Sequence, residues 1–335
     1  MAGREKGMEI GKVPENVLKR AVFKQLHHRR QEVLLRPGVG EDCSIVEAGE
    51  EEVFVFSVDP ITAVSKGAGK LAVHITANDL ASSGAEPVGL MVSILLPPRT
   101  REKKLRELMQ EMELVCKELN IEIIGGHTEV SDAVNRPVIT VTGIGKAKKD
   151  AFVSTSGLRP GDELVMTKWA GLEGTAIIAA EKKEKLLETL PGELVDTAAA
   201  FSQYLSVVQE ASVAAGLGAS AMHDVTEGGI FGALWEMGEA SNVGITAELM
   251  KIPIRQETIE VCEVFDINPY RMMSSGSLLI GCANGNLMVR ELEANGISAA
   301  VIGRATATND RVIENTYETR FLEPAGSDEL YKIYQ

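Results

Sequence analysis

Residues 67–83 restrict the fold of this chain more than any other segment. Their sequence, GAGKLAVHITANDLASS, is rich in alanine and other apolar residues and predicts a helix that is buried over most of its surface. Asp79 lies in the middle of this helix, where aspartate is a poor helix former and has no helix end to cap. An unpaired buried carboxylate costs several kcal/mol, so the fold must bring a cation to Asp79.

A polar stripe runs along the same predicted helix. Lys70, His74, Asn78 and Ser82 recur every four residues, and this spacing places them on one side of a helix. For the buried Asp79, a hard divalent ion bound by several carboxylates would supply the cation, and Mg²⁺ commonly binds one or two carboxylates together with phosphate oxygens.

The composition excludes several classes of function. Hydrophobic residues make up 44% and charged residues 24% of the 335 residues, as in ordinary globular proteins. The formal net charge of −14 argues against nucleic-acid binding, which favours faces rich in Lys and Arg. No apolar run approaches the roughly 18 residues of a membrane span, and the first residues, MAGREKGMEIGK, do not resemble a signal peptide. We therefore expect a cytoplasmic protein without a membrane or nucleic-acid partner.

Alternating strand and helix patterns predict a two-domain chain of the α+β (mixed α/β) class. The alternation starts near Gly40, and the run STSGLRPGDELV, rich in Ser, Gly and Pro, marks the change of domain. A strand at 121–126 is expected to end in a glycine pair, and one helix is expected at 195–215. The predicted divisions are a lead-in (1–38), an N-terminal domain (39–150), a C-terminal domain (151–320) and a tail (321–335).

Four aspartates stand at places where α/β proteins often gather site residues. Asp42 precedes a predicted strand, Asp59 and Asp224 end strands, and Asp79 is the buried helical residue. One aspartate alone is more often a turn or helix cap than a ligand. Taken together, the four carboxylates are the kind of oxygen ligands expected for Mg²⁺ on a nucleotide.

Two glycine pairs follow predicted strands and are candidates for phosphate contacts. Gly228 and Gly229 open a helix directly after HDVTE, and exposed amides at a helix N-terminus attract anions. The second pair lies in IIGGHTEV, whose candidate residues are Gly125, Gly126, His127 and Thr128. A lone histidine is more often structural than catalytic, and His127 stands out because a glycine turn and a carboxylate flank it.

The ordered set of motifs resembles the aminoimidazole ribonucleotide synthetase superfamily, which has a PurM-like fold. The motifs are GEDCS, SVDP, GKLAVHITANDLASSGAEP, IIGGHTEV, VTGIGKA, PGDELVMTKWAGLEGT and MHDVTEGGIFGAL. Within that superfamily the chain looks closest to the HypE-like hydrogenase expression/formation proteins or to AIR synthase related proteins. The resemblance implies an N-terminal sheet that forms a dimer barrel in a homodimer, and a C-terminal α+β domain that closes over an ATP cleft.

The resemblance also assigns roles by position. Mg²⁺ and ATP would lie between the domains, and phosphate from ATP would activate an amide or carbonyl oxygen of a small-molecule or protein substrate. The residues that match metal or phosphate positions are Asp42, Asp59, Asp79 and Asp224. The residues that match nucleotide-contacting positions are Lys70, Asn78, Gly125, Gly126, Thr128, Gly228 and Gly229. His127 and Asp224 are the candidates for catalysis.

Two departures from the family pattern leave the reaction open. HypE modifies a cysteine at its own C-terminus, whereas this sequence ends in DELYKIYQ and its last cysteine is Cys282. His127 stands where the family usually has Asp or Glu, and it could be a ligand that favours Mn²⁺, a general acid–base or a structural residue. The alternative functions are the aminoimidazole ribonucleotide synthetase reaction itself and an ATP-binding partner protein without catalysis.

Overall fold

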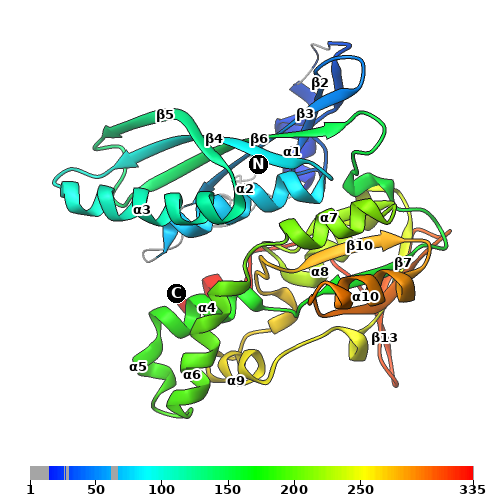
Figure 1. The fold of residues 1–335 in the computed structure, drawn as a ribbon. Coiled ribbons are helices and arrows are strands. Elements are labelled where there is room, and N and C mark those ends of the chain that lie inside the picture. Colours follow the sequence, from blue (N-terminus) through cyan, green and yellow to red (C-terminus); the bar gives the residue numbers. More distant parts are fainter. Residues whose placement is uncertain (1–14, 26, 28–29, 62–66, 335) are drawn as a thin grey trace, which may run out of the picture.

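The computed structural model describes residues 15–25, 27, 30–61 and 67–334 and arranges them around two sheets (Figure 1). The first sheet has the strand order β1 (Val33–Leu35), β2 (Ser44–Glu47), β3 (Glu52–Ile61), β6 (Val138–Lys148), β4 (Glu86–Leu96) and β5 (Glu122–Val130). Its neighbouring strands are antiparallel except for β4 and β5, which are parallel. A short lead-in precedes the sheet and consists of α1 (Glu15–Ala21) and η1 (Phe23–Gln25).

Helices α2 (Ala68–Ser82) and α3 (Glu102–Leu119) cover one face of the first sheet (Figure 1). The strands alternate accordingly, because successive side chains point to opposite faces. On β3, Val53 and Val55 are fully buried under the helices, whereas Phe54 and Val58 on the other face are 46% and 58% exposed. In the described part of the chain this open face also carries the exposed apolar side chain of Met91.

Strand β5 corrects one predicted boundary. The sequence pattern ends this strand at the glycine pair, but β5 continues to Val130 and pairs with β4 throughout. Gly126 makes this possible: its φ is 147°, and a Cβ there would lie 1.9 Å from the carbonyl oxygen of Val92. The glycine pair therefore lets β5 approach β4 closely and does not end the strand.

The second sheet belongs to the C-terminal half and begins after Lys148. Its strand order is β13 (Thr319–Phe321), β12 (Arg311–Glu314), β9 (Gly244–Glu248), β11 (Ala299–Thr306), β7 (Glu163–Thr167), β10 (Leu278–Cys282) and β8 (Ala221–Asp224). Helices α7 (Val208–Gly216) and α10 (Gly285–Ala294) pack on one face, and α8 (Gly229–Ala240) packs on the other. Among the described residues, no helix is both long enough and apolar enough to cross a membrane.

A separate group of helices lies beside the second sheet and corrects a second prediction. The group consists of α4 (Leu172–Glu181), α5 (Lys183–Leu186), α6 (Gly192–Ala199), η3 (Ala200–Tyr204) and α9 (Gln256–Phe265). The single helix expected at 195–215 is instead divided into α6, η3 and α7. The division allows Phe201 and Leu205 to pack into the core beneath α2, which a continuous helix would carry away from it.

Helix α2 lies between the two halves of the molecule, and 12 of its 15 residues are buried. Apolar contacts join it to Trp169, Leu172 and Phe201 of the C-terminal domain. Asn78 adds a polar connection: its Nδ2 donates to the carbonyl of Leu205, and its Oδ1 accepts from the amide of Val207, both at 2.8 Å. Asn78 therefore joins α2 to the connection between η3 and α7.

We predict that Asn78→Ala lowers the free energy of unfolding by about 2–3 kcal/mol, because it leaves a buried amide and a buried carbonyl without partners. Urea denaturation followed by circular dichroism would measure the change. Ser82→Ala on the same helix is the control, since Ser82 donates only to the carbonyl of Asp79 within α2, and we expect it to cost about 1 kcal/mol or less. Equal losses in the two variants would contradict the role given to Asn78.

Candidate functional site

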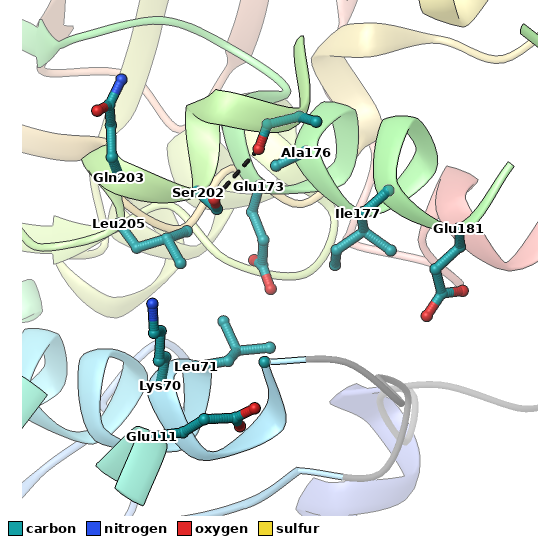
Figure 2. A pocket seen from close by; sticks show the side chains of 13 residues that line it. Lys70, Leu71, Glu111, Glu173, Ala176, Ile177, Glu181, Ser202, Gln203 and Leu205 are labelled. Carbon is teal, nitrogen blue, oxygen red and sulfur yellow. Dashed lines mark hydrogen bonds between the residues drawn. The ribbon is translucent and has the colours of Figure 1, made fainter. Parts of the chain in front are cut away.

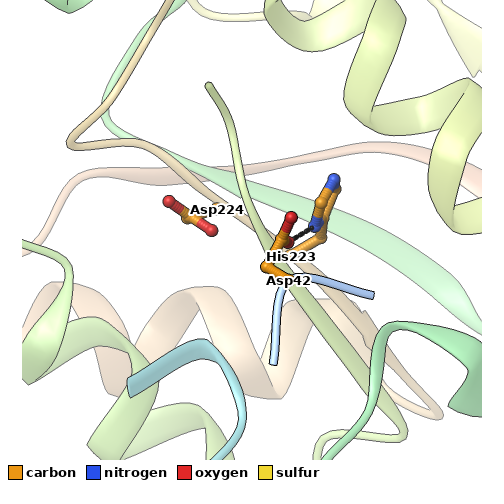
Figure 3. Close-up of side chains that lie close together, drawn as sticks. All are labelled: Asp42, His223 and Asp224. Atoms are coloured by element: carbon orange, nitrogen blue, oxygen red, sulfur yellow. Dashed lines mark ion pairs between the residues drawn. The ribbon is translucent and has the colours of Figure 1, made fainter. Parts of the chain in front are cut away.

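Carboxylates from four separate elements meet where the two domains face each other. Asp42 precedes β2, Asp59 lies near the end of β3, Asp79 lies on α2 and Asp224 ends β8. The first three line one cavity of about 170 Å³. Oxygen atoms of Asp42 and Asp224 lie within 4.8 Å of each other and of a nitrogen of His223 (Figure 3). The structure thus brings together all four of the predicted metal-binding aspartates.

Ser57 and Cys43 hold Asp79 in its place. The hydroxyl of Ser57 donates to Oδ2 of Asp79 and lies 3.3 Å from Oδ2 of Asp59, so it bridges the two carboxylates. The thiol of Cys43, next to Asp42, lies 3.2 Å from the main-chain carbonyl of Asp79. These contacts connect β2, β3 and α2 at one point.

The electrostatic environment of Asp79 is strongly unfavourable for a negative charge. The residue is only 3% exposed, and burial raises the pKa of its carboxyl well above the usual value. The negative charges of Asp224 and Asp59, followed by that of Asp42, raise this pKa further. A cation placed among these carboxylates would reverse the effect and favour the ionised form.

His223 is a member of this cluster that the sequence patterns do not single out. It is fully buried; its Nδ1 lies 2.9 Å from Asp42 and its Nε2 lies 3.0 Å from Glu236. Burial opposes protonation of the imidazole, but the two carboxylates outweigh it and raise the pKa of His223 well above the usual value. The signal in the sequence was its place beside Asp224 at the end of a strand, yet only the fold brings Asp42 and Glu236 to it.

The donor set suits a hard divalent cation. Asp42, Asp59, Asp79 and Asp224 offer carboxylate oxygens, the ligands that Mg²⁺ prefers. Both ring nitrogens of His223 face carboxylates, so this histidine orients Asp42 and supplies positive charge to the cluster. The close approach of these carboxylates favours a bound cation here, because an excess of buried negative charge needs compensation.

The glycine pair at the start of α8 lies at the edge of the same cavity, since Thr226 and Glu227 line it. The amide of Gly228 donates to Oδ2 of Asp328 at 2.7 Å, and Asp328 is 1% exposed. Gly229 packs so closely that a Cβ would lie 2.6 Å from the carbonyl oxygen of Tyr270. The helix N-terminus does attract an anion, and in this structure the anion is a side chain from the C-terminal segment.

The segment that contains His127 lies away from the aspartates within one chain. Asp59 pairs with Val141, Val141 with Val92, and Val92 with Gly126, so three strand spacings separate Asp59 from Gly126. At about 4.8 Å per spacing, the separation is about 14 Å. His127, the next residue along β5, is therefore too far from Asp59 to share a metal ion with it.

The side chains of this segment are exposed. His127 is 67% exposed, and its Nε2 lies 3.1 Å from Glu129. Gly125 and Thr128 are also exposed on β5. The structure consequently does not bring the predicted β5 residues to the carboxylate cavity of the same chain.

Lys70 borders a second cavity of about 390 Å³ between the domains (Figure 2). This cavity and the carboxylate cavity share two lining residues, Leu71 and Glu173. Glu173 lies in the first turn of α4 and is 4% exposed. It belongs to the motif AGLEGT, but its burial between two cavities follows only from the tertiary fold.

Comparison with known proteins places this chain in a family. The model of the AIR synthase related protein N-terminal domain matches residues 40–147, and that of the C-terminal domain matches residues 159–314. A Methanocaldococcus jannaschii protein, provisionally named as a hydrogenase expression/formation protein, is 28% identical over 319 residues, 91% of each chain. The carbamoyl dehydratase HypE of Rhodobacter capsulatus is 27% identical over 275 residues, 79% of this chain and 78% of the relative.

Solved structures show the same fold. HypE from a HypE–HypF complex superposes with a TM-score of 0.74 at 23% identity, covering 85% of this chain and 94% of that one. HypE in complex with ATP superposes with a TM-score of 0.68 at 19% identity, covering 94% and 95%. The two-domain α+β architecture described above is therefore the PurM-like one, and the chain belongs to the AIR synthase related protein family.

Proposed function

We propose that this protein is an ATP-dependent enzyme that transfers phosphate from Mg-ATP to an amide or carbonyl oxygen of an acceptor. The observation that carries the proposal is the convergence of Asp42, Asp59, Asp79 and Asp224 on one point between the domains. Carboxylates that gather without a cation repel one another, and a metal bound to a polyphosphate removes that repulsion.

The comparisons support ATP as the phosphate donor. Relatives that cover most of this chain are named carbamoyl dehydratase HypE, and one structure of the same fold is a complex with ATP. A dehydratase that acts on a carbamoyl group removes the oxygen of an amide. Phosphorylation of such an oxygen would make it a leaving group, which agrees with the proposed class of reaction.

The residues around the carboxylate cavity have different proposed roles. Asp42, Asp59, Asp79 and Asp224 would hold Mg²⁺, which supplies charge neutralisation to the phosphates when bound. His223 fixes the orientation of Asp42, and Ser57 fixes that of Asp79. The apolar residues Ile61, Leu71 and Ile75 line the same cavity.

The cysteine thiols of this chain are poor candidates for the phosphate acceptor. All four cysteines are buried and free. Burial raises the pKa of Cys43 well above the usual value and that of Cys282 to about 11, so both remain protonated near neutral pH. An oxygen acceptor therefore fits the site better than a thiol of this chain.

We further propose that the active form is a homodimer joined through the open face of the first sheet. Phe54, Val58 and Met91 expose apolar surface on that face, and contiguous apolar surface of this kind marks interfaces. A second subunit is also the simplest route by which His127, remote from the aspartates of its own chain, would reach a carboxylate cavity.

An alternative is a protein that binds ATP without turnover. The structural reason to consider it is the amide of Gly228, which already binds Asp328 and is not available to a phosphate in this arrangement. Measurement of ADP release under saturating Mg-ATP separates the two functions. Tight binding with no release in the presence of candidate amide acceptors would favour the silent binding protein.

If a metal ion mediates binding, ATP should bind only when Mg²⁺ is present. Asp79→Asn should then lower the affinity for Mg-ATP by about tenfold or more, which corresponds to about 1.4 kcal/mol of binding free energy. Isothermal titration calorimetry would measure both effects. Without metal, the Asn variant should be at least as stable as the wild type, because the amide removes a repelling charge. Ser82→Ala serves as the control on the same helix, and unchanged Mg-ATP affinity in the Asn variant would refute the metal site.

The dimer predicts that Val58→Glu converts the protein to a monomer, because a charge would be buried without a partner in the interface. Leu114→Glu is a matched control: Leu114 is 55% exposed, against 58% for Val58, but lies on α3 beneath the other face of the sheet. Analytical ultracentrifugation would report the masses of both variants. A dimeric Val58→Glu protein, or a monomeric wild type, would contradict the proposed interface.

A further inference from the structure

Strand β13 lies at one edge of the second sheet. It is the first strand in the order β13-β12-β9-β11-β7-β10-β8, and among the described residues it pairs with β12 alone. In Figure 1 its ribbon extends past the neighbouring elements at the lower right, away from α2 and the first sheet. The main-chain groups on its other side are therefore open to a further strand.

The hydrogen bonds of the β12–β13 hairpin identify those open groups. The amide of Leu322 donates to the carbonyl of the first residue of β12, and the carbonyl of Glu318 accepts from the residue after β12. Residues that bond the neighbouring strand alternate along an antiparallel strand, so Arg320 also faces β12. The N–H and C=O groups of Thr319 and Phe321 consequently point to the open edge.

The segment that leads into β13 exposes aromatic side chains next to a pair of charges. Residues 317–321 have the sequence YETRF, in a protein with 4% aromatic residues. Tyr317 is 94% exposed, the largest value among the described large hydrophobic residues, and Phe321 is 72% exposed. The guanidinium group of Arg320 contacts the carboxylate of Glu318. Exposed aromatic side chains of this kind are typical of interfaces.

These five residues are complementary to an antiparallel copy of themselves. When Thr319 faces Thr319 of a second copy, Glu318 lies opposite Arg320 of that copy, and Arg320 lies opposite its Glu318. In the same register Tyr317 lies opposite Phe321 at both ends. Opposite charges and aromatic pairs are stabilising when they face each other across two strands. The two central threonines form a hydrogen-bonded pair, because their main-chain groups point to the open edge.

Other registers fit less well. A centre at Arg320 places two guanidinium groups opposite each other, and like charges in that position are destabilising. A centre at Phe321 places Arg320 opposite Leu322, so the charges of Glu318 and Arg320 find no partners on the second copy. A centre between two residues places open main-chain groups opposite groups that already bond β12. Charge and hydrogen bonding therefore agree on a centre at Thr319.

We propose that β13 is a second interface of this protein and that its partner is another copy of the same chain, paired antiparallel about Thr319. The seven-stranded sheets of the two copies continue into one sheet across this contact. The interface is isologous, since each copy contributes the same five residues. Charges on an edge strand commonly prevent pairing, but the order of Glu318 and Arg320 attracts a copy related by two-fold symmetry and fixes its register.

The β13 interface is remote from the carboxylate cavity and does not depend on phosphate transfer. Asp224 ends β8 at the opposite edge of the same sheet, six strand spacings from β13. At about 4.8 Å per spacing, the separation is about 29 Å. The match to the C-terminal family model ends at residue 314, so β13 also lies beyond the part of the chain that the family model describes.

Sedimentation velocity over a concentration series measures this association. A stable interface buries about 800 Å² on each partner, and a contact of five residues is smaller, so the pairing should be weak and appear at high protein concentration. The mass at the dilute limit reports on the first-sheet contact, and at least a doubling of that mass with concentration reports on β13. A mass that stays constant up to about 1 mM protein would overturn the β13 interface.

Charge variants test the register. Glu318→Arg and Arg320→Glu each place like charges opposite each other twice in the symmetric contact, and each should weaken self-association about tenfold or more. Mixing the two variants restores opposite charges at both positions and should restore association. Both variants lose the contact between Glu318 and Arg320 within the chain, so a merely structural effect on the hairpin would persist in the mixture.

A main-chain variant and a matched control complete the test. Thr319→Pro removes the central donor and leaves the ladder to β12 intact, because proline is tolerated where the N–H of an edge strand points outward; it should abolish the association. Arg290→Glu on α10 should behave as the wild type. Arg290 and Arg320 are both 71% exposed, and each contacts a nearby glutamate.

The outcomes separate this inference from the proposed function. A mixture of the two charge variants that associates no more than either variant alone, or wild-type association in Thr319→Pro, would overturn the β13 interface. An equal loss of association in Arg290→Glu would do so as well, since it would show a general effect of charge. Mg-ATP binding should be unchanged in all of these variants, and its absence from the wild type would refute the proposed function without affecting the β13 interface.

Discussion

Repulsion among the carboxylates of Asp42, Asp59, Asp79 and Asp224 is the interaction on which the rest of the structure depends. Two of these side chains are almost fully buried, and each comes from a different element, so no local structure compensates their charge. His223 supplies one positive charge, but Asp42 and Glu236 share it. Burial and the charges of Asp224 and Asp59 raise the pKa of Asp79, so they disfavour the ionised form of this carboxyl group. Such a site is poor for stability and well suited to binding a cation.

Helix α2 shows how one element serves both domain docking and the site. Successive residues on a helix point about 100° apart, so Asn78 and Asp79 face different neighbours. Leu71, Ile75 and Asp79 line the carboxylate cavity, whereas Asn78 bonds the backbone of the C-terminal domain. The position of the carboxylate therefore depends on the docking of the domains, which connects the stability of the interface to the geometry of the site.

The C-terminal segment lines the carboxylate cavity and contacts a residue that lines the second cavity. Asp328 accepts a hydrogen bond from the amide of Gly228, and Tyr331 lines the carboxylate cavity. The hydroxyl of Tyr334 donates to Glu181, which lines the second cavity. Leu330, which is 1% exposed, anchors the segment in the core formed by α4, α6 and α9. The anion that the start of α8 attracts is thus provided internally, and phosphate at that amide would require Asp328 to move.

By itself, the sequence determined the two-domain α+β class, the buried helix at 67–83 and the set of four aspartates, because local periodicity and an unpaired carboxylate in an apolar helix constrain any fold. Close packing at Gly126 decided the extension of β5, and packing beneath α2 decided the division of the helix expected at 195–215. Neither contact can be seen as a local pattern in the sequence. His223 and Glu173 became visible only in the tertiary structure. Their charge state and position depend on groups such as Asp42 and Ser275, which lie far away in the chain. Electrostatic interactions follow distance in space and not distance in sequence.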